Sequence, residues 1–169
     1  MKNINFNSNQ DFHSRAKAIK NIMLELNIAK AELIRGCSQS EIENLEQEHN
    51  VMFPESYKIF LSYFGHGLGG KVMSDIEILY DDISGLTNEL RNETLIEEGD
   101  PILPDKAFVF ASRLGEQYMF FDASGILKEP PILYYKENAP NFSLAGNSIF
   151  DVLEREVQLS YNLKLKLEN

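Results

Sequence analysis

The chain has 169 residues, which favours one domain with a core large enough to be stable without disulfides or structural metals. Its residues are 43% hydrophobic and 25% charged, no stretch is apolar enough to predict a membrane span, and the net charge of −10 argues against direct nucleic-acid binding. Cys37 is the only cysteine, so an internal disulfide is excluded. Because residues 1–10 are polar, with no apolar run after a basic start, we expect a cytoplasmic protein.

The first predicted element is a helix from Asp11 to Arg35. Apolar residues recur there at steps of three or four, which is typical of an amphipathic helix, and Gly36 would end it. We expect the apolar stripe to pack on the rest of the protein. A coiled-coil or oligomer contact is the alternative, and the chain would then be a weak homodimer rather than a monomer. We interpret residues 1–36 as an N-terminal extension and residues 37–169 as the domain itself.

Two helices are predicted between residues 38 and 64. Ser38 and Glu41 have the spacing of a capping box, in which each side chain accepts a hydrogen bond from the other's backbone amide. Pro54 falls where proline is favoured, at the start of the second helix. The glycines of residues 65–70 would end that helix in a loop that contains His66.

The remainder predicts strands and two further helices. Alternation and helical periodicity give, in order, a strand at 73–80, a helix at 81–98, a hairpin of strands 107–111 and 117–122, a strand at 131–135 and a closing helix capped by Ser148. The expected fold class is α+β, with a mainly antiparallel sheet of about four to six strands flanked by helices.

The helical region resembles a known family. Residues 38–46 read S-x-x-E-I-x-x-L-E, and residues 51–67 read V-x-F-P-E-S-Y-K-x-F-L-x-x-F-G-x-G. This succession is similar to the opening of the SUKH superfamily, which includes yeast cell-wall-synthesis regulators. Phe121-Asp122 matches the apolar-Asp pair that ends a strand in the family pattern. The tip of the hairpin, residues 113–116, departs from the acidic, glycine-rich tip of many members.

The resemblance implies a protein-binding scaffold rather than an enzyme. Many bacterial members are immunity proteins, which bind and neutralise polymorphic toxins, so the expected function is an immunity protein whose partner is a cognate toxin, basic and of nuclease type. The alternative is a non-catalytic regulatory adaptor that binds an endogenous protein. No cofactor and no metal are expected.

The residues themselves agree with a non-enzymatic role. His13, His49 and His66 are far apart and have no neighbour at a recognisable metal-ligand spacing, and one cysteine makes a zinc site improbable. Cys37 lies at a predicted helix start, where the dipole lowers a thiol pKa, but an inert buried thiol is the favoured interpretation.

Acidic residues are concentrated in one window. Residues 74–105 carry a net charge of −9, so nearly all of the excess lies there. Such a surface would steer a basic partner, although a solvated surface without a partner is an equally weighted alternative. The expected partner contacts are Asp81, Asp82, Glu89, Glu93, Glu97, Glu98 and Asp100 in the window, Glu116 at the hairpin tip, and His66 in the glycine loop.

Overall fold

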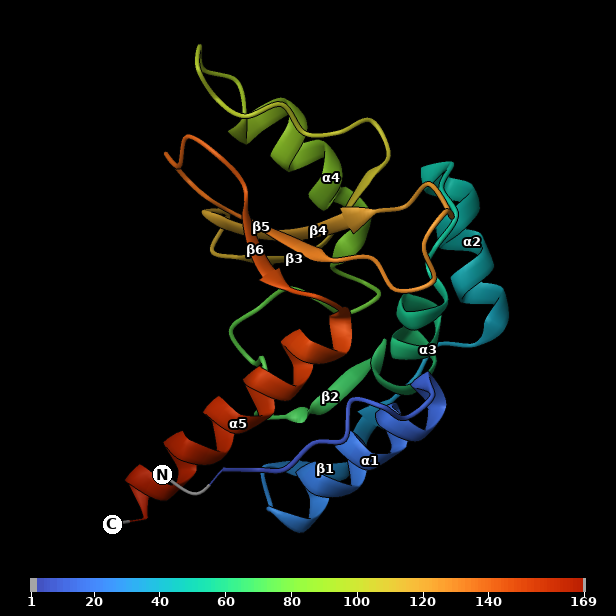
Figure 1. The fold of residues 1–169 in the computed structure, drawn as a ribbon, viewed down its shortest axis with the longest axis vertical. Coiled ribbons are helices and arrows are strands. Elements are labelled where there is room, and N and C mark those ends of the chain that lie inside the picture. Colours follow the sequence, from blue (N-terminus) through green and yellow to red (C-terminus); the bar gives the residue numbers. More distant parts are fainter. Residues whose placement is uncertain (1–2, 169) are drawn as a thin grey trace.

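The structure is a computed structural model in which residues 3–168 are described. The elements are α1 Phe12–Glu25, β1 Ala29–Arg35, α2 Gln39–His49, α3 Glu55–Phe64, β2 Gly67–Gly70, the helical turns η1 Ile83–Gly85, α4 Leu86–Glu89 and η2 Leu90–Thr94, then β3 Ala107–Arg113, β4 Gln117–Asp122, β5 Ile132–Lys136, β6 Ser143–Gly146 and α5 Ile149–Leu167. Figure 1 shows a sheet in the upper half of the molecule and β1, β2, α1 and α5 in the lower half. The predicted α+β class is confirmed. No helix in the described part of the chain is both long and apolar enough to cross a lipid bilayer.

The larger sheet is antiparallel, with the strand order β3-β4-β5-β6. Phe108 pairs with Phe121 across β3 and β4, as the predicted hairpin requires. Leu114 and Gly115 at the tip have φ angles of 58° and 67°, the left-handed pair that suits a tight hairpin turn. The hairpin is therefore confirmed, with β3 extending two residues beyond the prediction.

The predicted helix from Asp11 to Arg35 is wrong in its second half. Helix α1 ends at Glu25, Asn27 takes a left-handed φ of 53°, and Ala29–Arg35 forms strand β1, which pairs antiparallel with β2. The partner strand is the glycine run that was predicted to be a loop. A Cβ atom at Gly69 would lie 2.2 Å from the Ala29 Cβ, so glycine is needed there for the two backbones to approach. A pairing between segments this far apart overrides the local helical periodicity.

The predictions for residues 73–98 need two further corrections. Residues 73–80 do not form a strand, and within them only Glu77 makes an isolated bridge, to Ser112. Ile78 is nevertheless fully buried, so the apolar positions are used for packing rather than for a sheet. The predicted helix at 81–98 is present from Ile83 to Thr94 as three short helical turns, and its end comes four residues early.

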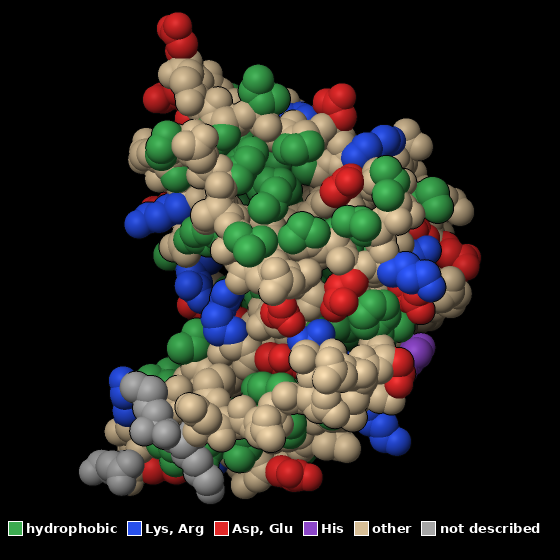
Figure 2. Space-filling view, in the orientation of Figure 1, with side chains coloured by type: hydrophobic (Ala, Val, Ile, Leu, Met, Phe, Trp, Pro, Cys, Tyr) green, Lys and Arg blue, Asp and Glu red, His purple; other side chains and the backbone are tan. Residues whose placement is uncertain are grey.

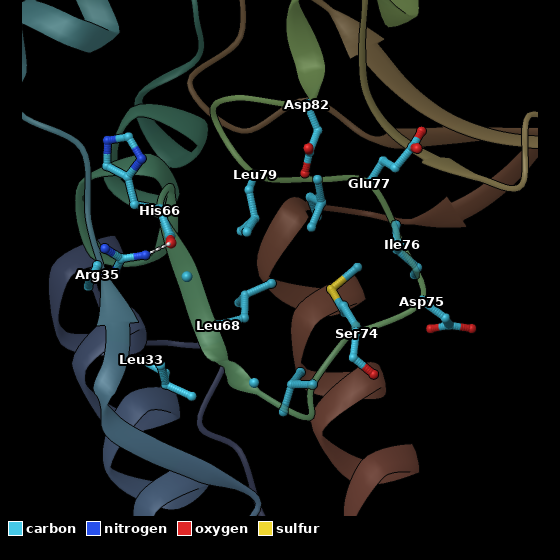
Figure 3. Close-up of a pocket in the computed structure, with 15 residues that line it drawn as sticks. Leu33, Arg35, His66, Leu68, Ser74, Asp75, Ile76, Glu77, Leu79 and Asp82 are labelled. Carbon is cyan, nitrogen blue, oxygen red and sulfur yellow. Dashed lines mark hydrogen bonds between the residues drawn. The ribbon is translucent and has the colours of Figure 1, made fainter.

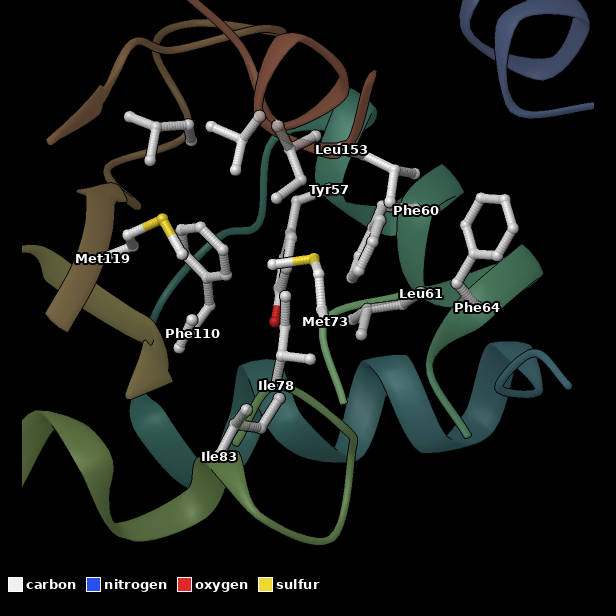
Figure 4. Close-up of a cluster of buried hydrophobic side chains, with 14 of the residues drawn as sticks. Tyr57, Phe60, Leu61, Phe64, Met73, Ile78, Ile83, Phe110, Met119 and Leu153 are labelled. Atoms are coloured by element: carbon white, nitrogen blue, oxygen red, sulfur yellow. The ribbon is translucent and has the colours of Figure 1, made fainter. Parts of the chain in front are cut away.

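Aromatic side chains from α3 and the hairpin form the centre of the core. The ring centroids of Tyr57 and Phe121 are 4.8 Å apart, and those of Phe53 and Phe108 are 4.7 Å apart. Figure 4 shows Tyr57 and Phe60 on α3 facing the buried side chains of the sheet and of α5. The aromatic residues of β3 and β4 are therefore core residues.

Helix α1 packs on the body of the protein through an apolar stripe and one buried arginine. Ala16, Ile19 and Met23 are fully buried, which confirms the expected packing of the stripe. Arg15 is only 4% exposed. Its guanidinium donates to Glu154 at 2.7 Å and to Asp151 at 2.6 Å, both on α5, so the N-terminal helix is joined to the C-terminal helix by charge as well as by burial.

Candidate partner-binding surface

The structure divides the predicted partner-binding residues among separate places. The first place is a cavity of about 470 Å³ between β2 and residues 71–82, lined in part by His66 and Asp82. Figure 3 shows Leu68 and Leu79 pointing into this space, whereas the His66 ring points away from it. Asp75 and Glu77 lie along the same lining and add to its acidity. Asp81 is exposed beside Asp82, just before η1.

His66 is held by internal contacts. Its Nε2 atom donates to Glu41 Oε1 at 2.9 Å, and its ring lies 5.1 Å from the ring of Tyr80. Hydrogen bonds from the Ser38 amide and hydroxyl, followed by the one from His66, lower the pKa of Glu41 to about 2. The predicted capping box is thereby confirmed. A partner that approaches His66 would meet a half-buried ring already paired with a carboxylate.

Cys37 lies next to this pair and is buried. Burial, and after it the charges of Glu41 and Asp81, raise the pKa of the Cys37 thiol to about 12. This direction is opposite to the lowering that a helix start produces, and its causes are the loss of solvent and then the two nearby carboxylates. The favoured interpretation of an inert buried thiol agrees with this direction as long as no cation displaces the thiol proton.

The second place is the end of the large sheet at the β3–β4 turn. Glu89 accepts a hydrogen bond from the Tyr118 hydroxyl, whose oxygen also lies 2.9 Å from the carbonyl oxygen of Gly115. Glu116 is exposed on the turn, and its carbonyl accepts from the amide of Glu137 at 2.7 Å. Glu137 was not among the predicted residues. It lies outside the acidic window in the sequence, and only the pairing of β4 with β5 brings it to Glu116.

Because Glu89 accepts a hydrogen bond from the Tyr118 hydroxyl, we expect the free energy of unfolding to depend on pH in the alkaline range. Burial, and after it the hydrogen bond to Glu89, raise the pKa of Tyr118 from 10.0 to about 12. A group whose pKa is higher in the folded state than in the unfolded state stabilises the protein at pH values below its unfolded-state pKa. This stabilisation is lost as pH rises through the folded-state pKa. The free energy of unfolding should therefore fall between about pH 10 and about pH 12, and the fall should be shallower in Tyr118→Phe. Urea unfolding at a series of pH values tests this, and parallel curves for the two proteins would contradict it.

The third place is the loop of residues 95–102, which projects from the top of the molecule in Figure 1. Glu97 and Glu98 are exposed on it, and the Glu97 amide donates to Asp100 at 2.9 Å, which closes the turn. Ile96 and Ile102 on the same loop are 68% and 91% exposed. Figure 2 shows hydrophobic side chains gathered over the upper half of this face, with acidic ones at the top. We call residues 95–102 the acidic loop; Glu93 is exposed on η2 shortly before it.

The acidic loop combines exposed carboxylates with exposed apolar side chains. Charges steer association, but an apolar anchor usually supplies most of the binding energy at a protein interface. No residue could be named for that role from periodicity, because residues 81–98 were predicted to form one helix, in which either Leu95 or Ile96 would face the core. The exposure of Ile96 follows from the early end of the helix at Thr94.

The comparisons with known proteins agree with this architecture. A family model described as SMI1-KNR4 cell-wall, SUKH_6, matches residues 39–152, about two thirds of the 169-residue chain. The match runs from α2 to the first turn of α5 and includes the β3–β4 hairpin and the acidic loop. A search of curated proteins found no match to the chain. The chain therefore belongs to the SUKH superfamily.

Proposed function

We propose that this protein is an immunity protein that neutralises a cognate toxin domain by covering its functional surface, without catalysis. The family is associated with protein partners and with toxin-immunity or regulatory roles. The observation that carries the proposal is the acidic loop, where Glu97, Glu98 and Asp100 stand between two exposed isoleucines at a projecting end of the molecule.

The charge of the loop favours a basic partner. A toxin that acts on nucleic acid has a basic substrate cleft, and an acidic surface competes with phosphates for such a cleft. Long-range attraction speeds the encounter, and burial of Ile102, the most exposed apolar side chain of the loop, would then slow dissociation. The exposed carboxylates would form the polar rim around that anchor.

Where a long toxin is encoded immediately upstream of this gene, co-expression of the chain with the C-terminal domain of that toxin tests the function. We expect the chain to restore growth and to co-purify with the toxin domain as a stable complex. Growth restored without a complex would contradict occlusion, and failure to restore growth with a well-folded chain would contradict the immunity role.

Two variants of the acidic loop test the surface in the same system. Glu97→Lys combined with Glu98→Lys should lower the association rate constant about tenfold and weaken its salt dependence. Ile102→Ala should raise Kd about thirtyfold, mainly through faster dissociation, if it is the anchor. The matched controls are Glu25→Lys with Glu32→Lys, and Leu163→Ala, which change exposed residues at the other end of the molecule. Equal kinetics for loop and control variants would mean that the loop is a solvated surface only.

A second function is favoured by the family description, which refers to the cell wall. In this case the chain would be a regulatory adaptor that binds an endogenous protein of the cell. It would give no protection against the neighbouring toxin, and its deletion would alter growth under cell-wall stress in cells that lack that toxin.

A further inference from the structure

Three side chains with metal-binding atoms meet where β1, α2 and β2 come together. Cys37 lies in the link before α2, Glu41 in the first turn of α2, and His66 just before β2. The Cys37 sulfur, a Glu41 carboxylate oxygen and a His66 ring nitrogen all lie within 4.8 Å of one another. We propose that Cys37, Glu41 and His66 form a binding site for a transition-metal ion of the Zn²⁺ class, with a fourth position open to solvent.

The distances suit such an ion after a small adjustment. Metal–sulfur and metal–nitrogen or oxygen bonds in tetrahedral zinc sites place neighbouring ligand atoms about 3.3–3.6 Å apart. The Nε2–Oε1 pair of His66 and Glu41, now 2.9 Å apart, would open slightly. The sulfur, which lies within 4.8 Å of both atoms, would move closer by about 1.3 Å at most. One sulfur, one nitrogen and one oxygen donor favour Zn²⁺ or Co²⁺ over Mg²⁺ and Ca²⁺, which prefer all-oxygen sites.

The backbone holds the three ligands in place before any ion binds. The Cys37 amide donates to the carbonyl of Leu61 at 2.8 Å, and the His66 amide donates to that of Arg35 at 2.9 Å. The second oxygen of Glu41 accepts from the Ser38 amide at 2.7 Å, so Oε1 is the oxygen left for the ion. Little conformational entropy would be lost on binding.

Glycine at position 65 is what allows the sulfur to lie beside His66. A Cβ atom there would fall 2.3 Å from Cys37 Sγ and 2.7 Å from the Leu61 carbonyl oxygen. The sulfur therefore packs directly against the Gly65 backbone. The side chains of His66 and Glu41 are 24% and 35% exposed, which leaves a route for an ion and room for a water ligand.

The charges nearby mostly favour a cation. Glu41 and Asp81 both act electrostatically on the thiol. Two groups oppose a cation: the positive end of α2, which faces the other oxygen of Glu41, and Arg35, whose guanidinium donates to the His66 carbonyl at 3.4 Å. On binding, the ion would replace the thiol proton and would take the lone pair of Nε2, with the imidazole in the tautomer that carries its proton on Nδ1.

Titration of the reduced, untagged protein with Co²⁺ is the direct test. Because Cys37 is the only cysteine of the chain, any thiolate-to-Co²⁺ charge-transfer band reports this site. We expect such a band together with visible bands of four-coordinate Co²⁺, both abolished by Zn²⁺ competition. Zn²⁺ at about a hundredfold excess over Kd should also raise Tm by about 5 °C or more.

Variants separate the site from non-specific binding. Cys37→Ser should lose the charge-transfer band, and His66→Asn should weaken Co²⁺ binding at least tenfold, since even outer-shell groups contribute about that much. His13→Asn, which changes an exposed histidine on α1, should leave binding unchanged. Circular dichroism checks that each variant is folded. If Cys37→Ser, at a buried position, fails to fold, His66→Asn, at a partly exposed position, still tests whether the site binds Co²⁺. Absence of a thiolate band at millimolar Co²⁺, or equal affinity in His66→Asn, would overturn the site.

Discussion

Arg15→Ala is expected to lower the free energy of unfolding by about 3 kcal/mol at neutral pH, the low end of the range for breaking a buried ion pair. The side chain donates to Glu154 and Asp151, lies 3.5 Å from Glu129, and its guanidinium carbon is 5.5 Å from the centre of the Phe150 ring. Alanine would leave the three carboxylates without their cation. Asp151 and Glu129 are about a third exposed, so water screens them in part, and this selects the low end.

Urea unfolding of Arg15→Ala beside Lys17→Ala measures this effect. Lys17 is exposed on the same helix, so its loss should change the free energy of unfolding by about 0.5 kcal/mol or less. A loss below about 1 kcal/mol for Arg15→Ala would show that the network adds little to stability. A second, separate unfolding transition would show that α1 and β1 unfold independently of the rest, which bears directly on the expected division at residue 36.

Phe108→Ala should be at least as damaging, with an expected loss of about 3–5 kcal/mol. Phe108 is 1% exposed, and its ring packs against those of Phe53, Tyr57 and Phe121, with His49 edge-on at 5.1 Å. The truncation removes apolar surface from the centre of the core. It also leaves a cavity, because rings contributed by the helices and the hairpin cannot all close in on the vacated space.

Phe108→Leu is the matched control for this position, since it keeps most of the side-chain volume and should cost about 1.5 kcal/mol or less. The same urea experiment compares both variants with the parent protein. A similar loss for alanine and leucine would mean that ring contacts, and not cavity formation, dominate at this site.

The acidic loop and the metal site can be tested separately because they share no residues. The acidic loop lies at the top of the molecule in Figure 1, whereas Cys37, Glu41 and His66 lie near the junction of α2, α3 and β2. Variants at Glu97, Glu98 or Ile102 should leave Co²⁺ binding unchanged. Failure of either proposal would therefore leave the other intact.

Local signals in the sequence were sufficient for much of the fold. The capping box of Ser38 and Glu41 and the cap at Ser148 were correct because a cap is formed by residues three apart, whatever packs around it. The hairpin of β3 and β4 was correct because alternation and a short turn are also local. The closing helix was correct because helical periodicity is also a local signal.

Long-range contacts decided the rest. Strand β1 exists because Ala29–Arg35 pairs with glycines that lie more than thirty residues away, and periodicity at residues 30–35 carries no trace of that partner. For the same reason, the acidic residues of the window at 74–105, which are close in the sequence, lie at separate places in the folded protein. Local patterns in the sequence were enough to predict the family, the caps, the hairpin and the excess of acidic residues. The exposure of Ile96 and Ile102, and the proximity of Cys37, Glu41 and His66, became visible only in the folded structure. Both depend on contacts between separate elements, which the spacing of residues along the chain does not encode.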